Sequence, residues 1–116
     1  MSSLIARHAT LHQPGLFIIE VCATVARRTR NRALASEAGL ATLATPKLIV
    51  HALDHELAAE AAEIASVCAL RGADAVYVAT ARRMHSTLLT LDREVRERAD
   101  AVVDVQTPTE WTNSTA

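Results

Sequence analysis

Short apolar segments alternate with amphipathic helical segments along this chain, and this alternation constrains the fold more than any other feature. The segment 48–53 (LIVHAL) favours a strand because it is short and rich in aliphatic and β-branched residues. A helical pattern over 55–70 follows, and the apolar segment 87–91 (TLLTL) favours another strand. Strands that alternate with helices predict a parallel sheet with helices on its faces, which is the α/β fold class.

The helix that follows the 48–53 strand has the clearest pattern. Leu57, Ala61, Ile64 and Cys68 repeat at helical spacing and form one apolar face. Asp54 suits the N-cap of this helix because its side chain can accept a backbone N–H. The other expected features are a helix tail over 4–9, an extended piece over 10–13, Pro14 in the first turn of a helix over 16–30, a helix over 34–43, a helix end at Gly72, helices over 75–84 and 93–98, a last strand over 101–105 and a partly irregular tail over 107–116.

The length and composition predict one domain with an aliphatic core. A chain of 116 residues is in the single-domain range, and half of its residues are apolar. Phe17, Tyr77 and Trp111 are the only aromatic residues. The formal net charge of −1 argues against a globally basic nucleic-acid binder. Cys22 and Cys68 have no CxxC partner, and no early apolar run is long enough for a signal peptide, so a reduced, cytoplasmic protein is expected.

The basic residues are nearly all arginine, and they form clusters along the sequence. Two interpretations stay open for them. Charged clusters on helices usually mark solvated faces, and they can also polarise a surface toward a charged partner. The clusters are Arg27, Arg28, Arg30 and Arg32, then Arg82 and Arg83, then Arg93, Arg96 and Arg98.

Three carboxylates stand out by their positions. Glu20 interrupts an apolar helical run, Asp74 precedes an apolar helix, and Asp92 ends the 87–91 strand. Singly, each has a structural explanation: Glu20 as a rim residue of its helix, and the two aspartates as N-caps. Together, their oxygen atoms suit Mg²⁺ or Mn²⁺. A divalent cation bound there would activate water and stabilise charge on a phosphodiester.

The histidines and the glycines suggest no other site. His51 and His55 are close in sequence, but the expected change from strand to helix at Asp54 separates their faces, so no zinc site is predicted. The sequence contains neither a glycine-rich phosphate loop nor a GxSxG elbow. The carboxylates are therefore the candidate site residues.

Two segments resemble the PIN-domain family, and within it the VapC-type ribonuclease toxins. The segment 70–81 (LRGADAVYVATA), followed by 87–92 (TLLTLD), is similar to the carboxy-terminal half of a PIN domain. The stretch from Pro14 through Glu20 to Arg28 resembles the family's segment with a glutamate before a helix. The likeness extends over about residues 10–111. It implies a three-layer α/β/α fold, in which helices cover both faces of a short parallel sheet.

The same resemblance implies a metal-dependent ribonuclease that uses Mg²⁺ or Mn²⁺. Glu20, Asp74 and Asp92 correspond to three of the family's four acidic positions, and they are the implied catalytic and metal-binding residues. Thr90 corresponds to a hydroxyl residue that helps to hold the metal or a water molecule. Many relatives are toxins that pair with a small antitoxin and form homodimers. The implied partners are therefore an RNA substrate, an antitoxin protein and a second copy of the chain.

The sequence departs from the family pattern at its beginning. The segment Met1–His8 contains no acidic residue, and Glu20 is the first acid in the chain, so the strand that carries the family's first aspartate is not matched. In the family that strand lies in the middle of the sheet, so the strand segments near 10–13 and 87–91 are expected to lack a pairing partner. A second copy is then expected to cover the exposed surface, with the helix Phe17–Val25 in or near the dimer interface. Weak or no RNA cleavage is expected from these residues alone. Three alternatives stay open: an enzyme whose upstream coding segment is missing, a non-catalytic PIN-like module that binds RNA or protein, and a truncated reading frame without a function of its own.

Overall fold

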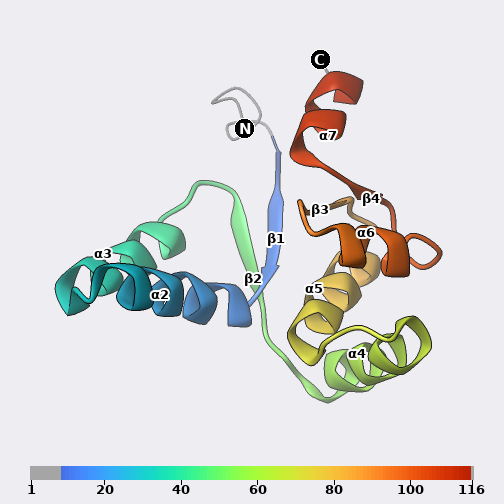
Figure 1. Ribbon diagram of the computed structural model, residues 1–116, viewed down its shortest axis with the longest axis horizontal. Coiled ribbons are helices and arrows are strands. Elements are labelled where there is room, and N and C mark those ends of the chain that lie inside the picture. The colour runs from blue at the N-terminus through green and yellow to red at the C-terminus, as the bar shows by residue number, and fades with distance from the viewer. Residues whose placement is uncertain (1–8, 116) are drawn as a thin grey trace.

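The computed structural model of the protein describes residues 9–115. Helices surround short parallel strands, so the chain has the mixed α/β character that the sequence predicts (Figure 1). The expected helix tail over 4–9 lies almost wholly outside the described residues. In chain order, the elements are β1 (Leu11–Pro14), α2 (Leu16–Thr29), α3 (Arg32–Leu43), β2 (Leu48–His51), α4 (His55–Cys68), α5 (Gly72–Arg83), β3 (Leu88–Leu89), α6 (Arg93–Ala99), β4 (Val105–Gln106) and α7 (Pro108–Thr115).

The parallel sheet consists of two separate pieces. Strand β1 pairs with β2 in parallel, with Leu11 opposite Leu48. Strand β3 pairs with β4 in parallel, with Leu88 opposite Val105. Among the described residues, no strand joins β1 to β3. The outer edges of β1 and β3 are therefore among the strand edges that no described strand covers.

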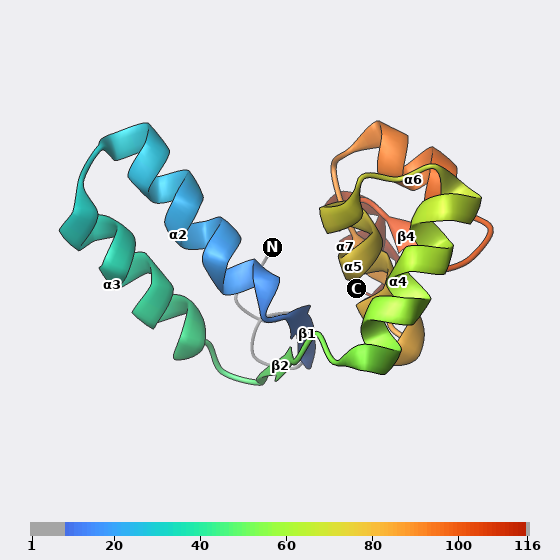
Figure 2. The same cartoon turned by 90° about the horizontal axis from the view of Figure 1, so that it is seen from below.

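The hydrophobic core lies where α4, α5 and α6 meet (Figure 2). Leu57 of α4 and Val78 of α5 are completely buried, and Ala79 beside Val78 is too small to hold the two helices apart. Burial of such side chains stabilises the fold by about 25 cal/mol per Å² of apolar surface. No single described helix is long and apolar enough to span a membrane. Helices α4 and α5 taken together have the length and composition of a broken span, with a bend of 114° between them.

Helices α2 and α3 form a hairpin that extends away from this core (Figure 2). The two helices approach closely at Gly39, where an added Cβ atom would lie only 2.6 Å from the Sγ atom of Cys22. Glycine in a helix interior usually costs stability, so its presence here is explained by packing. Helix α2 buries none of its residues, which leaves its apolar side chains available beside β1.

Two expectations for α4 and α5 are wrong. Helix α4 ends at Cys68, before Gly72, because Ala69 adopts a left-handed conformation with φ of 54° and donates its N–H to the carbonyl of Ala65. Gly72 instead begins α5, and Arg71, in an extended conformation, is the N-cap residue. Asp74 therefore lies inside the first turn of α5 and does not cap it.

The carboxyl end also differs from the expectation. The strand predicted over 101–105 starts only at Val105, because the backbone N–H groups of Val102 and Val103 both bond to the carbonyl of Ala99 and form a turn. The tail forms helix α7 instead of irregular structure, and Thr107 and Glu110 cap that helix. Near the other end, Pro14 closes β1 and does not enter the helix that follows.

Candidate functional site

Asp74 and Asp92 lie on either side of one cation. The Nε atom of Arg71 is 3.3 Å from Oδ2 of Asp74, and its Nη2 atom is 3.7 Å from Oδ2 of Asp92. Asp74 is held by the first turn of α5, and Asp92 by the end of the segment after β3. The fold thus brings two of the three predicted carboxylates to one guanidinium group.

The two carboxylate oxygens of Asp92 have different roles. Its Oδ1 atom accepts the backbone N–H groups of Glu94 and Val95, at 2.9 and 3.3 Å, and so caps α6 as predicted. Its Oδ2 atom is the one that faces Arg71. The backbone N–H of Asp92 donates to the hydroxyl of Thr90 at 3.1 Å, so Thr90 holds the backbone from which the Asp92 carboxylate extends. One oxygen is structural, and the other can bind a cation.

Glu20, the third predicted carboxylate, is exposed on α2 and lines a groove together with Tyr77 of α5. Burial first, and then the negative charges of Glu20 and Asp74, together raise the pKa of Tyr77 to about 12. Each of these charges opposes formation of the phenolate. The negative charges of Glu20 and Asp74 therefore both act on the hydroxyl group of Tyr77.

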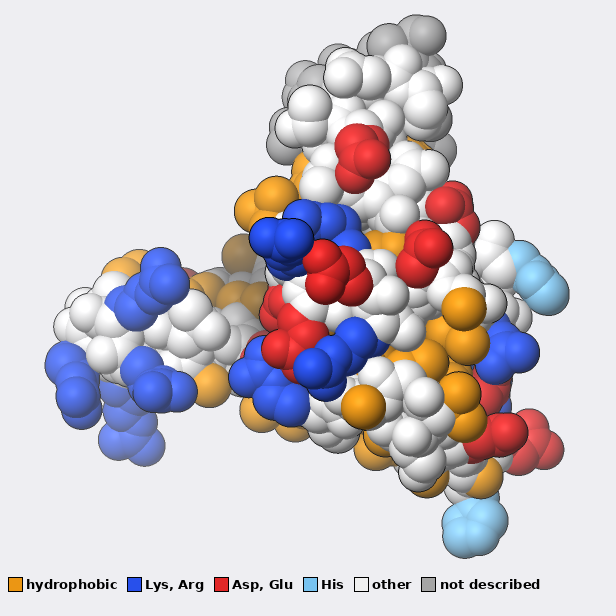
Figure 3. Space-filling view, turned by 45° about the vertical axis from the view of Figure 1, so that its right-hand side comes forward, with side chains coloured by type: hydrophobic (Ala, Val, Ile, Leu, Met, Phe, Trp, Pro, Cys, Tyr) orange, Lys and Arg blue, Asp and Glu red, His pale blue; other side chains and the backbone are white. Residues whose placement is uncertain are grey.

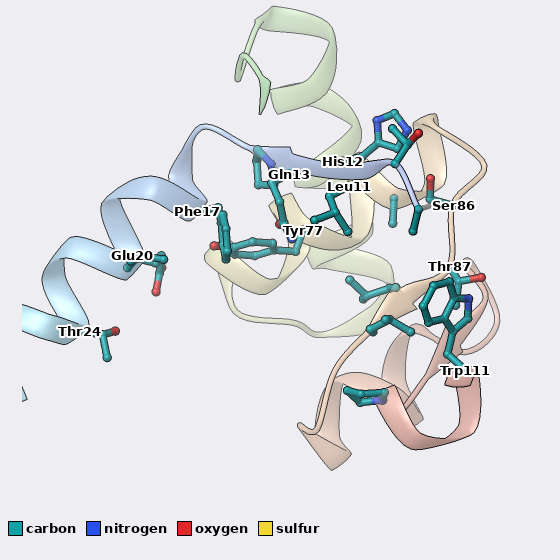
Figure 4. A pocket seen from close by; sticks show the side chains of 18 of the residues that line it. Leu11, His12, Gln13, Phe17, Glu20, Thr24, Tyr77, Ser86, Thr87 and Trp111 are labelled. Atoms are coloured by element: carbon teal, nitrogen blue, oxygen red, sulfur yellow. The ribbon is translucent and has the colours of Figure 1, made fainter. Parts of the chain in front are cut away.

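The groove itself runs between the half-sheets and has a volume of about 880 Å³. Strand β1 and the segment 86–89 form two of its sides, and α2, α5 and α7 contribute the rest. Phe17 and Tyr77 lie toward one end of it, and Trp111 lies toward the other end (Figure 4). A concave, mainly apolar site with a few polar groups is the usual form of a binding site.

The sequence pattern that defines the PIN domain matches residues 2–101 of this chain. The chain belongs to the PIN domain family. PIN domains are nuclease-type proteins that generally depend on a divalent metal and typically bind RNA. Among curated proteins, none matches the chain.

The acidic residues of this PIN domain fit a metal in part. Within residues 9–115, no three His, Cys, Asp or Glu side chains lie close enough to hold a metal ion together. Asp74 and Asp92, however, share a cation already, and their oxygen atoms are the ligands that Mg²⁺ prefers. Mg²⁺ is commonly held by one or two carboxylates together with water and substrate phosphate. The pair therefore suits a metal that is shared with a substrate, and Glu20 stands outside the pair.

One contact near the groove was not predicted from the sequence. The Nδ1 atom of His12 on β1 is 2.9 Å from the Nε2 atom of His51 on β2. The pKa of His51 is lowered by burial first, and then by the nearby charges of His12 and Arg83. The pairing depends on the register of two strands that are distant in sequence, so no local spacing could indicate it. His55 begins α4 and takes no part in the pair.

Proposed function

We propose that this PIN domain is a Mg²⁺- or Mn²⁺-dependent endoribonuclease of the VapC toxin type, with Asp74 and Asp92 as the metal-binding pair. The observation that carries the proposal is the single guanidinium group that both carboxylates contact. Because two nearby carboxylates repel each other unless a cation neutralises them, this position favours positive charge. A bound divalent metal supplies Lewis-acid stabilisation of a phosphodiester and an activated water molecule.

The remaining site residues act around that pair. Thr90 holds the Asp92 backbone through its hydroxyl group, so it positions the carboxylate. Glu20 and Asp74 both raise the pKa of the Tyr77 phenol, so Glu20 is linked to the pair through this side chain. We assign Glu20 the role of third acid, which orients a water molecule. Catalysis then depends on Glu20, Asp74 and Asp92 together.

The tip of the α2–α3 hairpin offers a surface for RNA phosphates. Its arginines are exposed, and positive side chains dominate this projecting arm (Figure 3). Basic side chains that contact phosphates provide affinity without sequence specificity. Replacement of each phosphate-contacting arginine by glutamine should lower the salt dependence of RNA binding by roughly 0.7 in log–log slope. The arginines are Arg27, Arg28, Arg30 and Arg32.

Cleavage of a single-stranded RNA in the presence of Mg²⁺ tests the proposal. With no acidic residue before Glu20, the 116-residue chain is expected to cleave weakly or not at all, and Asp92→Asn should remove what activity there is. Glu97→Gln is the matched control, because Glu97 lies on the same helix and pairs only with Arg93 among the described residues. Strong cleavage that Asp92→Asn abolishes would show that a fourth acid is not needed. Cleavage that Asp92→Asn leaves intact would contradict the site.

We also propose that the protein forms a homodimer, with α2 in or near the interface, and that an antitoxin protein binds it. Exposed aliphatic side chains on the hairpin support the dimer: Ile19 is 65% exposed, Leu40 68% and Leu43 55%. Apolar surface of this kind favours association. Sedimentation equilibrium should give twice the chain mass, and Ile19→Arg should return it to the monomer. A monomer at all concentrations in the unchanged protein would remove the dimer from the proposal.

The alternative function is a non-catalytic PIN-like module that binds RNA or protein. The absence of a three-ligand metal cluster among residues 9–115 is the observation that favours it. It predicts RNA binding that neither Mg²⁺ nor Asp92→Asn affects. The cleavage and binding measurements on the same variants therefore separate the two functions.

A further inference from the structure

One edge of β1 faces the groove. The N–H groups of Leu11 and Gly15 bond to the carbonyls of Lys47 and His51, at 3.0 and 2.9 Å. The backbone N–H and C=O groups of the odd-numbered residues of β1 therefore point toward β2. Backbone groups alternate in direction along a strand. The N–H and C=O of His12 therefore point to the opposite side, where the groove lies and no described strand pairs with them.

The edge of β3 has the same property. The N–H groups of Leu88 and Thr90 bond to the carbonyls of Asp104 and Gln106, at 2.8 and 3.0 Å. The backbone groups of Leu88 and Thr90 therefore point toward β4. By the same alternation, the backbone groups of Thr87 and Leu89 point away from β4. Both residues line the groove. Two unpaired strand edges, one from each half-sheet, thus border a single groove.

Side chains make the groove apolar along most of its length. Phe17, Val21 and Val25 repeat on one face of α2, and none of them is buried by the described chain. Tyr77 and Ala81 come from α5. Among the described lining residues there is no lysine and no arginine, and Glu20 is the one carboxylate. A nucleic acid phosphate would find no lysine or arginine among these residues and one carboxylate.

We propose that the groove is a docking site for an extended, apolar peptide segment of a partner protein, which joins the two half-sheets into one. An extended backbone presents N–H and C=O groups on both sides, so it is the chemical class of ligand that can pair with His12 on one side and Leu89 on the other. Side chains at alternate positions of the peptide would cover the apolar face of α2. The proposal does not depend on nuclease activity.

Fluorescence anisotropy with a defined peptide tests it on the full chain. The probe is a fluorescein-labelled peptide of alternating valine and threonine, about six residues long as ordinary strands are, with lysine at each end for solubility. Saturable binding is expected, together with a shift in the emission of Trp111, which is the only tryptophan and lines the groove. The same peptide with N-methylated backbone amides should bind at least about tenfold more weakly, a loss of roughly 1.4 kcal/mol. Equal binding of the two peptides would overturn the proposal.

A pair of variants locates the binding. Val21→Arg places a charge in the groove and should weaken the unmodified peptide at least about tenfold. Val67→Arg makes the same substitution on α4, where Val67 is 72% exposed and outside the groove, and should leave binding unchanged. Equal effects of the two, with both variants folded by circular dichroism, would overturn the proposal.

Two further results would assign the groove to another occupant and so contradict a partner segment. If the peptide binds only after Leu4→Asp and Ile5→Asp are introduced, the chain's own first residues fill the groove. If the unchanged protein is a dimer that excludes the peptide, and Val21→Arg makes it a monomer, a second copy fills it. Binding of the peptide to the unchanged chain, without competition from either, is the expected result.

Discussion

Asp74 and Asp92 share the guanidinium group of Arg71, with contacts of 3.3 and 3.7 Å from their Oδ2 atoms. The Arg71 side chain is 75% exposed, whereas those of Asp74 and Asp92 are 28% and 39% exposed. Ion pairs that are this accessible contribute only about 0–1 kcal/mol, because water and salt screen them. Arg71 is therefore a weakly held cation at the position where we propose a divalent metal.

Removal of Arg71 should strengthen metal binding. In Arg71→Gln the two carboxylates lose their neutralising partner, so a divalent cation no longer competes with the guanidinium group. From the strength of such pairs, Mn²⁺ should bind about two- to fivefold more tightly, as measured by isothermal titration calorimetry. Arg93→Gln is the control, since Arg93 pairs with Glu97 on an exposed face of α6. Weaker Mn²⁺ binding in Arg71→Gln would mean that Arg71 helps to hold the site together.

Tyr77 reports on the two acids beside it. It is the only tyrosine, so the ultraviolet absorbance of phenolate gives its pKa directly. Burial, then Glu20, then Asp74 raise that pKa to about 12. Glu20→Gln and Asp74→Asn should each lower it toward 10, and Glu37→Gln on α3 should not. An unchanged pKa in Glu20→Gln would place Glu20 too far from α5 to share its site.

The same shift has a consequence for stability in alkali. Because the pKa of Tyr77 is higher in the folded than in the unfolded chain, the folded state holds its proton more tightly. The resulting stability is complete below the unfolded pKa of about 10 and is lost as the pH rises toward 12. Tyr77→Phe should be free of this loss. Urea unfolding across that range measures it, with far-ultraviolet circular dichroism as the signal.

Gly39 is expected to be the glycine that the fold needs most. In Gly39→Ala the new Cβ atom would lie 2.6 Å from the Sγ atom of Cys22, so α2 and α3 must separate or Cys22 must rotate. Overpacking costs about 1–3 kcal/mol, and the gain in helix propensity returns about 1 kcal/mol. A net loss of about 1 kcal/mol in urea unfolding is expected. Gly72→Ala, where no atom lies within 4 Å of the added Cβ, should not destabilise the protein.

A double variant separates packing from backbone effects at this position. Cys22→Ala removes the sulfur atom that the new Cβ would meet. In that background Gly39→Ala should become neutral or stabilising, since only the helix-propensity gain remains. A loss of stability that is the same with and without Cys22 would exclude the close contact as its cause.

The sequence predicted the features that local chemistry determines. Asp54 and Asp92 were expected as N-caps, and both accept backbone N–H groups from the helices that they begin. The helix α7 was missed although its signal is present: Thr107 and Glu110 bond reciprocally, as a capping box does. The end of α4 was misplaced because Ala69 takes the left-handed conformation that a nearby glycine was expected to provide.

What the sequence did not indicate depends on contacts between distant segments. The division of the sheet into two pieces was expected, because the family's middle strand is not matched, and the described strands β1 and β3 do not pair with each other. The set of side chains that lines the groove between them depends on how distant segments pack, and no local pattern encodes that. The role of Arg71 was missed for the same reason. Its spacing from Asp74 was visible, but its contact with Asp92 requires the turn that brings the start of α5 beside the start of α6.

His51 should make the fold sensitive to mild acid. Its pKa is lowered by burial, then by His12 and then by Arg83, so the folded chain binds a proton less readily than the unfolded chain does. The unfolded state therefore binds more protons below its pKa of about 6.5, and stability falls as the pH drops from there through the lower folded pKa. Asp54 and Glu110, whose pKa values are also lowered, lose their contribution only below about pH 4.

Urea unfolding from about pH 7 down to about pH 5 isolates this histidine. His51→Gln keeps a polar side chain on β2 that needs no proton, so its stability should change less over this range than that of the unchanged protein. His85→Gln is the control, because His85 follows α5 and is not a member of the His12–His51 pair. If His51→Gln and the unchanged protein lose stability in parallel, burial of His51 is not the source of the acid sensitivity. If His85→Gln alone removes it, the sensitive group lies after α5 and not between the strands.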